Sequence, residues 1–374
     1  MAAYGGKRLY YLDYLRAFLI GLVVLYHIAG VYSVSIPGYV QSSASSIFTE
    51  AVLVLFPLYN FAWFLGAFFL VSGYLSVASL VRKGPWRFAI GRIMRLGIPL
   101  AAYSLIMNPL ASYISVFQIT RSFTLSLTWQ SYAPFIGLGV FWFVALLLGF
   151  DLLFAAYYTV RGRRWGTAPQ ARPHPIPKYR WIAVFVLLLA IAEWLITLII
   201  PLGSYFLFLP VIGYLPQYIS FFIVGVVAAR NGWFSSAKVG MARVLAAAML
   251  VSTATLFPLA LSGGDNAFTG GLNVYSFIYA LWGAVTAVGM CFAIIVLFRS
   301  FLNRDGRFRG FLYEQSYAVY FIHIVVIAAA TATVLQWITT YPVLEFLAAS
   351  AVILPVCWAA AYLVRKIPFV DRVL

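Results

Sequence analysis

The sequence predicts an all-α polytopic membrane protein with about ten transmembrane helices and with both termini in the cytoplasm. Hydrophobic residues make up 64% of the 374 residues, aromatic residues 18% and charged residues only 9%. That composition is typical of a chain whose solvent is mostly lipid. Long apolar runs recur along the whole length, and basic residues gather between alternate runs.

The apolar runs are each long enough to cross the hydrocarbon core of a bilayer as a helix. Several contain proline, which membrane helices tolerate where neighbouring groups satisfy the freed backbone. We expect one membrane-embedded domain over residues 1–374. The expected spans lie near 9–32, 53–80, 94–111, 134–160, 180–200, 205–229, 240–261, 274–298, 313–338 and 343–365.

The distribution of Lys and Arg predicts the orientation. With a cytoplasmic N-terminus, 23 of the 25 basic residues fall on the cytoplasmic side; the others are Arg16, inside the first span, and Arg121, outside. This bias follows the positive-inside rule. The largest group lies in an extended basic linker at about 161–180.

The formal charge of +16 does not indicate a nucleic-acid partner. The basic residues are spread over six juxtamembrane segments instead of forming one reading surface. Contact with anionic lipid headgroups explains most of them. The two cysteines, Cys291 and Cys357, fall inside expected helices; they indicate neither a disulfide framework nor a metal site.

The first span contains three ionisable residues, Asp13, Arg16 and His27. Such groups are costly at membrane depth and mark function by default. Eleven residues separate Arg16 from His27 along the chain, which is about three helical turns, so both project from nearly one face about 16 Å apart. Asp13, at i−3, can neutralise Arg16, and the pair is either purely structural or part of a site.

Further polar side chains stand in the later spans. Ser316, Tyr320 and His323 recur at i, i+4 and i+7, so they form a polar stripe that either faces a cavity or joins helices by hydrogen bonds. Glu193 lies well inside the fifth span and needs a partner or a proton, so it either lines a substrate cavity or is a neutral carboxyl group that bonds to a neighbouring helix. Trp142 is either a surface for a sugar ring or an interfacial anchor.

Several motifs resemble those of the acyltransferase family 3 membrane acyltransferases. The first is Leu12-Asp-Tyr-Leu-Arg16 followed after ten residues by His27. The others follow in the family's order: Phe68-Phe-Leu-Val-Ser-Gly-Tyr74, Arg92-Ile-Met-Arg95, Phe141-Trp-Phe143 and Ser316-Tyr-Ala-Val-Tyr-Phe-Ile-His323.

This resemblance implies the family's ten-helix domain, here of the stand-alone type without the fused extracytoplasmic hydrolase-like domain. It also implies transfer of an acyl group, such as acetyl or succinyl, from cytoplasmic acyl-CoA. The expected acceptor is a hydroxyl on an extracytoplasmic or lipid-linked carbohydrate, a glycolipid or a similar molecule. The expected location is the bacterial plasma (inner) membrane, and no tightly bound cofactor or metal is expected.

Within that picture, a neutral imidazole at His27 is suited to remove the acceptor proton as a general base. Arg92 and Arg95, three residues apart, share one helical face if the third helix begins there, and can address the anionic end of acyl-CoA, with Arg87 assisting. Arg16 would bind part of the donor or stabilise charge on the carbonyl oxygen. Ser72, Gly73 and Tyr74 either admit the pantetheine arm or pack helices.

Two other functions fit the residues. A polytopic transporter or flippase for a glycan or lipid-linked substrate would also have about ten spans and midplane charges, but its usual mark is repeated halves, which this sequence does not show. A noncatalytic sensor or assembly protein of the same fold would tolerate His27→Ala without loss of an acylated product.

Overall fold

The computed structural model describes residues 3–4, 7–33, 47–120, 129–161, 174–204, 209, 212–264, 266–333 and 342–374. Most of the basic linker predicted at 161–180, namely 162–173, therefore lies outside the described residues.

The described part of the chain has ten helical spans long and apolar enough to cross a membrane. This confirms the all-α class and the predicted number of spans. The side of the membrane on which the termini lie stays a prediction. The spans are Tyr10–Tyr32, Ala51–Lys83, Pro85–Val116, Ala133–Arg161, Tyr179–Thr197, Ile212–Asn231, Val239–Leu261, Val274–Phe301, Arg307–Thr333 and Val343–Val364.

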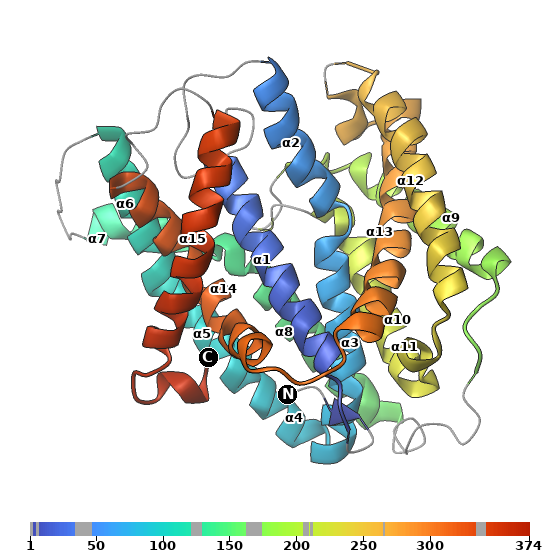
Figure 1. The fold of residues 1–374 in the computed structure, drawn as a ribbon, viewed down its shortest axis with the longest axis horizontal. Coiled ribbons are helices and arrows are strands. Elements are labelled where there is room, and N and C mark those ends of the chain that lie inside the picture. Colours follow the sequence, from blue (N-terminus) through green and yellow to red (C-terminus); the bar gives the residue numbers. More distant parts are fainter. Residues whose placement is uncertain are drawn as a thin grey trace. The chain divides into compact units, whose positions relative to one another are not determined.

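The helices group into two compact units. Figure 1 labels the helices and colours them along the sequence. Unit 1 comprises Met1–Leu15, Ala62–Ile90 and Gly149–Arg304. Within it, α3 packs on α10, and α13 packs on both α9 and α12. Its elements are β1 (Ala3–Tyr4), β2 (Lys7–Arg8), the start of α1 (Tyr10–Tyr32), α3 (Phe64–Lys83), most of α4 (Pro85–Arg92), most of α8 (Trp142–Arg161), α9 (Tyr179–Thr197), η6 (Ile212–Tyr214), α10 (Leu215–Asn231), α11 (Trp233–Ser236), α12 (Val239–Leu261), η7 (Ala267–Thr269) and α13 (Val274–Phe301).

Unit 2 comprises Arg16–Phe61, Gly91–Leu148 and Asp305–Leu374. Within it, α14 packs against α6 and α15. Its elements are the rest of α1, α2 (Ile47–Phe61), the end of α4, the π-helical segments η1 (Ile93–Gly97) and η2 (Tyr103–Met107), α5 (Ile98–Ala102), α6 (Asn108–Thr120), α7 (Trp129–Tyr132), η3 (Ala133–Phe135), η4 (Gly139–Phe141), the start of α8, α14 (Arg307–Thr333), α15 (Pro342–Val364) and η9 (Val370–Arg372). The prediction of one membrane-embedded domain over residues 1–374 stays a prediction.

The third span begins at Pro85, not near residue 94 as predicted. Gly84 has a φ of 76° and ends α3, and Pro85 is well suited to the first position of a helix. Arg87, Arg92 and Arg95 lower the hydropathy of the first turns of this span. The apolar pattern therefore predicts a start of the span that is too late in the sequence. Arg92 and Arg95 therefore lie inside this helical span.

Two prolines shape the third span. Pro99 and Pro109 have no N–H to offer to the carbonyl groups four residues earlier, those of Arg95 and Leu105. Each proline follows a π-helical segment, η1 and η2 respectively. The Tyr317 hydroxyl donates to the Arg95 carbonyl at 3.0 Å, and the Tyr132 hydroxyl donates to that of Leu105. Tyrosines on other elements thus satisfy both freed carbonyls.

Glycines allow α3 and α10 to approach each other closely in unit 1. A Cβ added at Gly73 would lie 2.2 Å from the Phe222 carbonyl oxygen, and one at Gly225 would lie 2.1 Å from that of Leu70. Both clashes are with backbone, which has little room to move. Small residues at a helix interface are the usual means of close packing in membranes.

We therefore expect Gly73→Ala to destabilise unit 1, by about 1–3 kcal/mol if overpacking has its usual cost. The measurement is the thermal unfolding midpoint of the purified protein in detergent. Gly240→Ala is the matched control, because a Cβ at Gly240 in α12 meets nothing within 4 Å. Equal midpoints for the two variants would contradict the close-packing account.

Candidate active site

Helix α1 carries two partly exposed polar residues on an otherwise buried face. Asp13, Ile20 and Val24 on this side of the helix are 2%, 7% and 0% exposed. Arg16 and His27 lie on the same face yet keep intermediate exposure. Both side chains are therefore partly accessible, and the predicted Arg16–His27 stripe is present on the helix.

His27 meets a second histidine, His323, from α14 of the same unit. The two ring centroids are 5.2 Å apart, with the planes tilted by 47°. The Tyr26 ring packs edge-on against His27 at 5.1 Å. No hydrogen bond to either ring nitrogen of His27 is found among the described residues, so an incoming hydroxyl would not have to displace a protein partner.

The hydrogen bonding of His323 indicates its tautomer. Its Nδ1 lies 2.7 Å from the Tyr320 carbonyl oxygen, which can only accept, so Nδ1 carries the proton. In the neutral ring Nε2 then presents a lone pair. His323 is 0% exposed, and its Nε2 has no hydrogen-bond partner in the part of the chain that the structure describes. A buried polar atom in this state needs an explanation, and a catalytic role is one of those open to it.

The other members of the α14 stripe are engaged within the protein. The Ser316 hydroxyl donates to the Tyr313 carbonyl at 2.8 Å. The Tyr320 hydroxyl donates to the Val140 carbonyl, and its ring stacks on Phe141 at 4.9 Å. Of the three predicted stripe residues, the structure thus brings His323 against His27.

The Phe141-Trp142-Phe143 motif contributes mainly through its first residue. Phe141 is stacked between Tyr320 and Tyr103, whose ring centroid is 4.2 Å away. Trp142 is buried, 6.4 Å from the Phe143 ring. An aromatic wall therefore supports the ring of Tyr320, which in turn lies 5.6 Å from His323.

The two arginines of the Arg92–Arg95 motif are arranged differently from the prediction. Arg92 ends α4 and Arg95 lies in the π-helical segment η1. Residues three apart in an α-helix differ by about 60° around the axis, and the wider π turn increases this angle. The prediction that both side chains share one α-helical face is therefore replaced by a wider spread, with Arg92 partly buried and Arg95 exposed.

Tyr317 links this arginine segment to the first helix. Besides capping the Arg95 carbonyl, its hydroxyl lies within electrostatic range of the guanidinium groups of both Arg95 and Arg16. In unit 2, two of the predicted arginines therefore act electrostatically on one phenol of α14. His323, on the same helix, is six residues further along the chain.

The remaining predicted residues belong to unit 1. Ser72 is partly exposed, and Gly73 is engaged in the close contact with α10. The Tyr74 ring stacks on Phe234 at 4.3 Å. Arg87, on α4, is exposed.

Glu193 is also in unit 1, on α9, and is 3% exposed. Its carboxyl group acts electrostatically on Tyr214 and Tyr279, whose hydroxyl oxygens are 3.2 Å apart. The predicted acceptor-side residue thus lies in a buried cluster with two tyrosines.

Two features of the structure were missed in the sequence. Tyr317 was not singled out, although Pro99 four residues after Arg95 signals a carbonyl that needs a donor. Asp151 in α8 is 0% exposed and accepts a hydrogen bond from the Ser76 hydroxyl at 2.7 Å. A carboxylate in the middle of an apolar span is itself the signal that could have found it.

No group of three or more His, Cys, Asp or Glu residues within the described ranges is placed to hold a metal ion. The chemistry that the described residues of unit 2 offer is proton transfer at two imidazoles and anion binding at arginines.

In a comparison with known families, a model of the acyltransferase 3 family, described as an acyltransferase domain, matches residues 9–362. The match covers segments of both units. Comparisons with curated proteins and with solved structures gave no match.

We expect Tyr317→Phe to destabilise the protein by about 1 kcal/mol, because the Arg95 carbonyl loses its hydroxyl donor. The measurement is the thermal unfolding midpoint in detergent. Tyr179→Phe, at an α9 residue that is 47% exposed, is the control. A Tyr317→Phe midpoint equal to that of the control would show that the hydrogen bond contributes nothing.

Proposed function

Since the chain belongs to the acyltransferase 3 family and is a membrane acyltransferase, we propose that it transfers an acyl group from acyl-CoA to a hydroxyl. The proposed acceptor is a carbohydrate, glycolipid or similar molecule on the extracytoplasmic side or linked to lipid. The observation that carries the proposal is the meeting of His27 and His323 within unit 2.

The arginines support an acyl-CoA donor. The nucleotide end of CoA carries several phosphate charges, and guanidinium groups bind such oxygens with directed hydrogen bonds. Arg92 and Arg95 belong to the segment that the charge distribution predicts to be cytoplasmic. Arg16, which shares the neighbourhood of Tyr317 with Arg95, extends this positive region onto α1. A donor bound here would direct its pantetheine arm along the face that carries His27.

The proposed reaction is a direct transfer. The acceptor oxygen attacks the acyl carbon of the thioester while a ring nitrogen of His27 takes the hydroxyl proton. The C–S bond then breaks as the new C–O ester bond is complete. CoA leaves as a thiolate and takes up the proton from the imidazolium, so the enzyme is restored without a covalent intermediate.

In this scheme His323 is a positioning residue. It is fully buried and its Nδ1–H is committed to the Tyr320 carbonyl, so it presents only an acceptor, Nε2. This hydrogen-bond-accepting Nε2 lies beside His27. It favours the His27 tautomer and ring orientation in which the other nitrogen of His27 faces the hydroxyl of the acyl acceptor. His27 is the base because it keeps accessible surface whereas His323 does not.

The bacterial plasma membrane is the proposed location, with both termini in the cytoplasm. The opposite placement of donor and acceptor follows from their chemistry. Acyl-CoA is a charged cytoplasmic metabolite, and its nucleotide end has no reason to enter hydrocarbon. A base inside the membrane-spanning part of the protein would let a hydroxyl approach from the other side.

We expect His27→Ala to lower the transfer rate by about 10²–10⁴-fold, the usual contribution of a general base. The assay follows acceptor-dependent release of CoA thiol from acetyl-CoA or succinyl-CoA by the reconstituted protein, with candidate glycans as acceptors. His174→Ala is the matched control, because His174 is exposed and only its backbone groups make hydrogen bonds. Transfer by His27→Ala at the rate of His174→Ala would refute the assignment.

We expect Arg92→Ala and Arg95→Ala each to weaken acyl-CoA binding by about 10- to 100-fold, the loss of one charge-assisted interaction of about 1.5–3 kcal/mol. Titration calorimetry of the purified variants measures this, with unfolding midpoints to confirm the fold. Arg243→Ala, at an exposed residue of α12, is the control. Unchanged affinity in both variants would return these arginines to a role in topology alone.

A further inference from the structure

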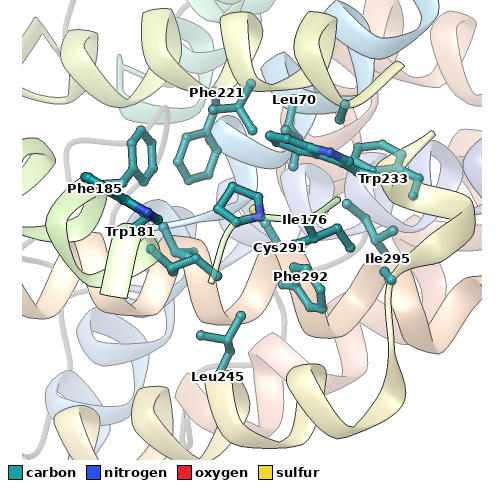
Figure 2. A pocket seen from close by; sticks show the side chains of 17 residues that line it. Leu70, Ile176, Trp181, Phe185, Phe221, Trp233, Leu245, Cys291, Phe292 and Ile295 are labelled. Atoms are coloured by element: carbon teal, nitrogen blue, oxygen red, sulfur yellow. The ribbon is translucent and has the colours of Figure 1, made fainter. Parts of the chain in front are cut away.

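Unit 1 contains a cavity of about 290 Å³ that is lined by side chains from α3 and from α9 to α13. In Figure 2, Trp181 and Phe185 flank one side of it and Trp233 and Ile295 the other, with Cys291 between them. Its size approaches the lower end of the range for ligand pockets, about 300–1,000 Å³. None of the residues assigned above to acyl transfer lines it.

Specific hydrogen bonds build the walls of this cavity. The His174 backbone N–H donates to the Asn231 side chain at 3.1 Å, and the Trp233 indole N–H donates to the His174 carbonyl at 2.9 Å. These bonds fix the segment that leads to Ile176 and Pro177, two lining residues. On the other side, Arg299 donates to the carbonyl groups of Phe234, Ser235 and Ala237.

The lining is suited to hydrocarbon. Its side chains are aliphatic and aromatic, with the Cys291 thiol and two indoles as the polar atoms, and the Trp233 indole N–H is already bonded to His174. Water in a cavity needs two to four polar partners. An apolar chain instead gains from every contact with such walls.

The mouth of the cavity carries positive charge. Trp181 lines the cavity and is 58% exposed, so the cavity reaches the surface of unit 1 there. The Arg180 guanidinium lies over the Trp181 ring, 5.5 Å from its centroid, and Lys178 is exposed one residue after the lining residue Pro177. Tryptophan and basic residues together are typical of the membrane–water interface, where cations attract anionic lipid headgroups.

We propose that this cavity binds one hydrocarbon chain of an anionic phospholipid, whose phosphate lies at Lys178 and Arg180. Charge complementarity selects the headgroup and the apolar walls hold the chain. The site is independent of the proposed acyl transfer, because it is built from other residues and needs no reaction. The lipid would act as a structural part of unit 1, holding α9 against α10 and α13.

The first test fills the cavity. Val288→Phe places a larger side chain at a lining position of α13, and Val251→Phe makes the same change on α12 at a residue that is 63% exposed and does not line the cavity. Each variant is purified from vesicles of phosphatidylcholine with phosphatidylglycerol and examined by native mass spectrometry. We expect wild type and Val251→Phe to retain a phosphatidylglycerol that Val288→Phe loses. Equal retention by all three would overturn the proposal.

A second test leaves the cavity intact. In the Cys357→Ala variant Cys291 is the remaining thiol, and its modification by N-ethylmaleimide reports on access to the cavity. We expect phosphatidylglycerol in nanodiscs to slow this reaction at least several-fold relative to phosphatidylcholine alone. Lys178→Gln with Arg180→Gln should remove the difference, whereas Arg243→Gln should keep it. Equal rates in the two lipids without substitution would contradict the anionic-headgroup assignment.

Discussion

The structure depends on one constraint: inside a membrane a polar group must find its partner within the protein, because no water is there to supply one. The third span shows the constraint at the level of the backbone. Pro99 and Pro109 each free a carbonyl, and Tyr317 and Tyr132 each provide the missing donor. The same constraint explains why the Ser76 hydroxyl donates to the Asp151 carboxylate and why the His323 Nδ1–H donates to the Tyr320 carbonyl. Among the described residues, the Nε2 of His323 and the ring nitrogens of His27 have no such partner, and the two imidazoles lie together in unit 2.

The fold was predictable where a single physical signal dominated. The first span was expected at 9–32 and runs over Tyr10–Tyr32, because an unbroken apolar run has few alternatives in lipid. The third span was placed too late, since Arg87, Arg92 and Arg95 mask the start of a helix that Gly84 and Pro85 define. The π-helical segments could not be predicted, because an apolar pattern does not distinguish a π-helical turn from an α-helical one.

The candidate site was predictable only where its geometry follows from a single helix. The shared face of Arg16 and His27 is a property of one helix and follows from its period. The contact between His27 and His323 is a property of helix packing between distant segments, for which the sequence carries no period. Periodicity leaves two interpretations of the stripe of Ser316, Tyr320 and His323 open. In the structure the hydroxyls of Ser316 and Tyr320 donate to backbone carbonyl groups, whereas the His323 ring contacts His27.

The central claim is that His27 receives the proton of the acceptor hydroxyl beside a bound acyl-CoA. A structure of the protein with S-(2-oxopropyl)-CoA tests it most directly, because a methylene between the sulfur and the carbonyl makes this analogue of acetyl-CoA resistant to acyl transfer while it keeps a carbonyl. The account predicts the acyl carbonyl next to the His27 ring and the nucleotide phosphates on Arg92 and Arg95. An analogue bound with its carbonyl away from both His27 and His323 would contradict it.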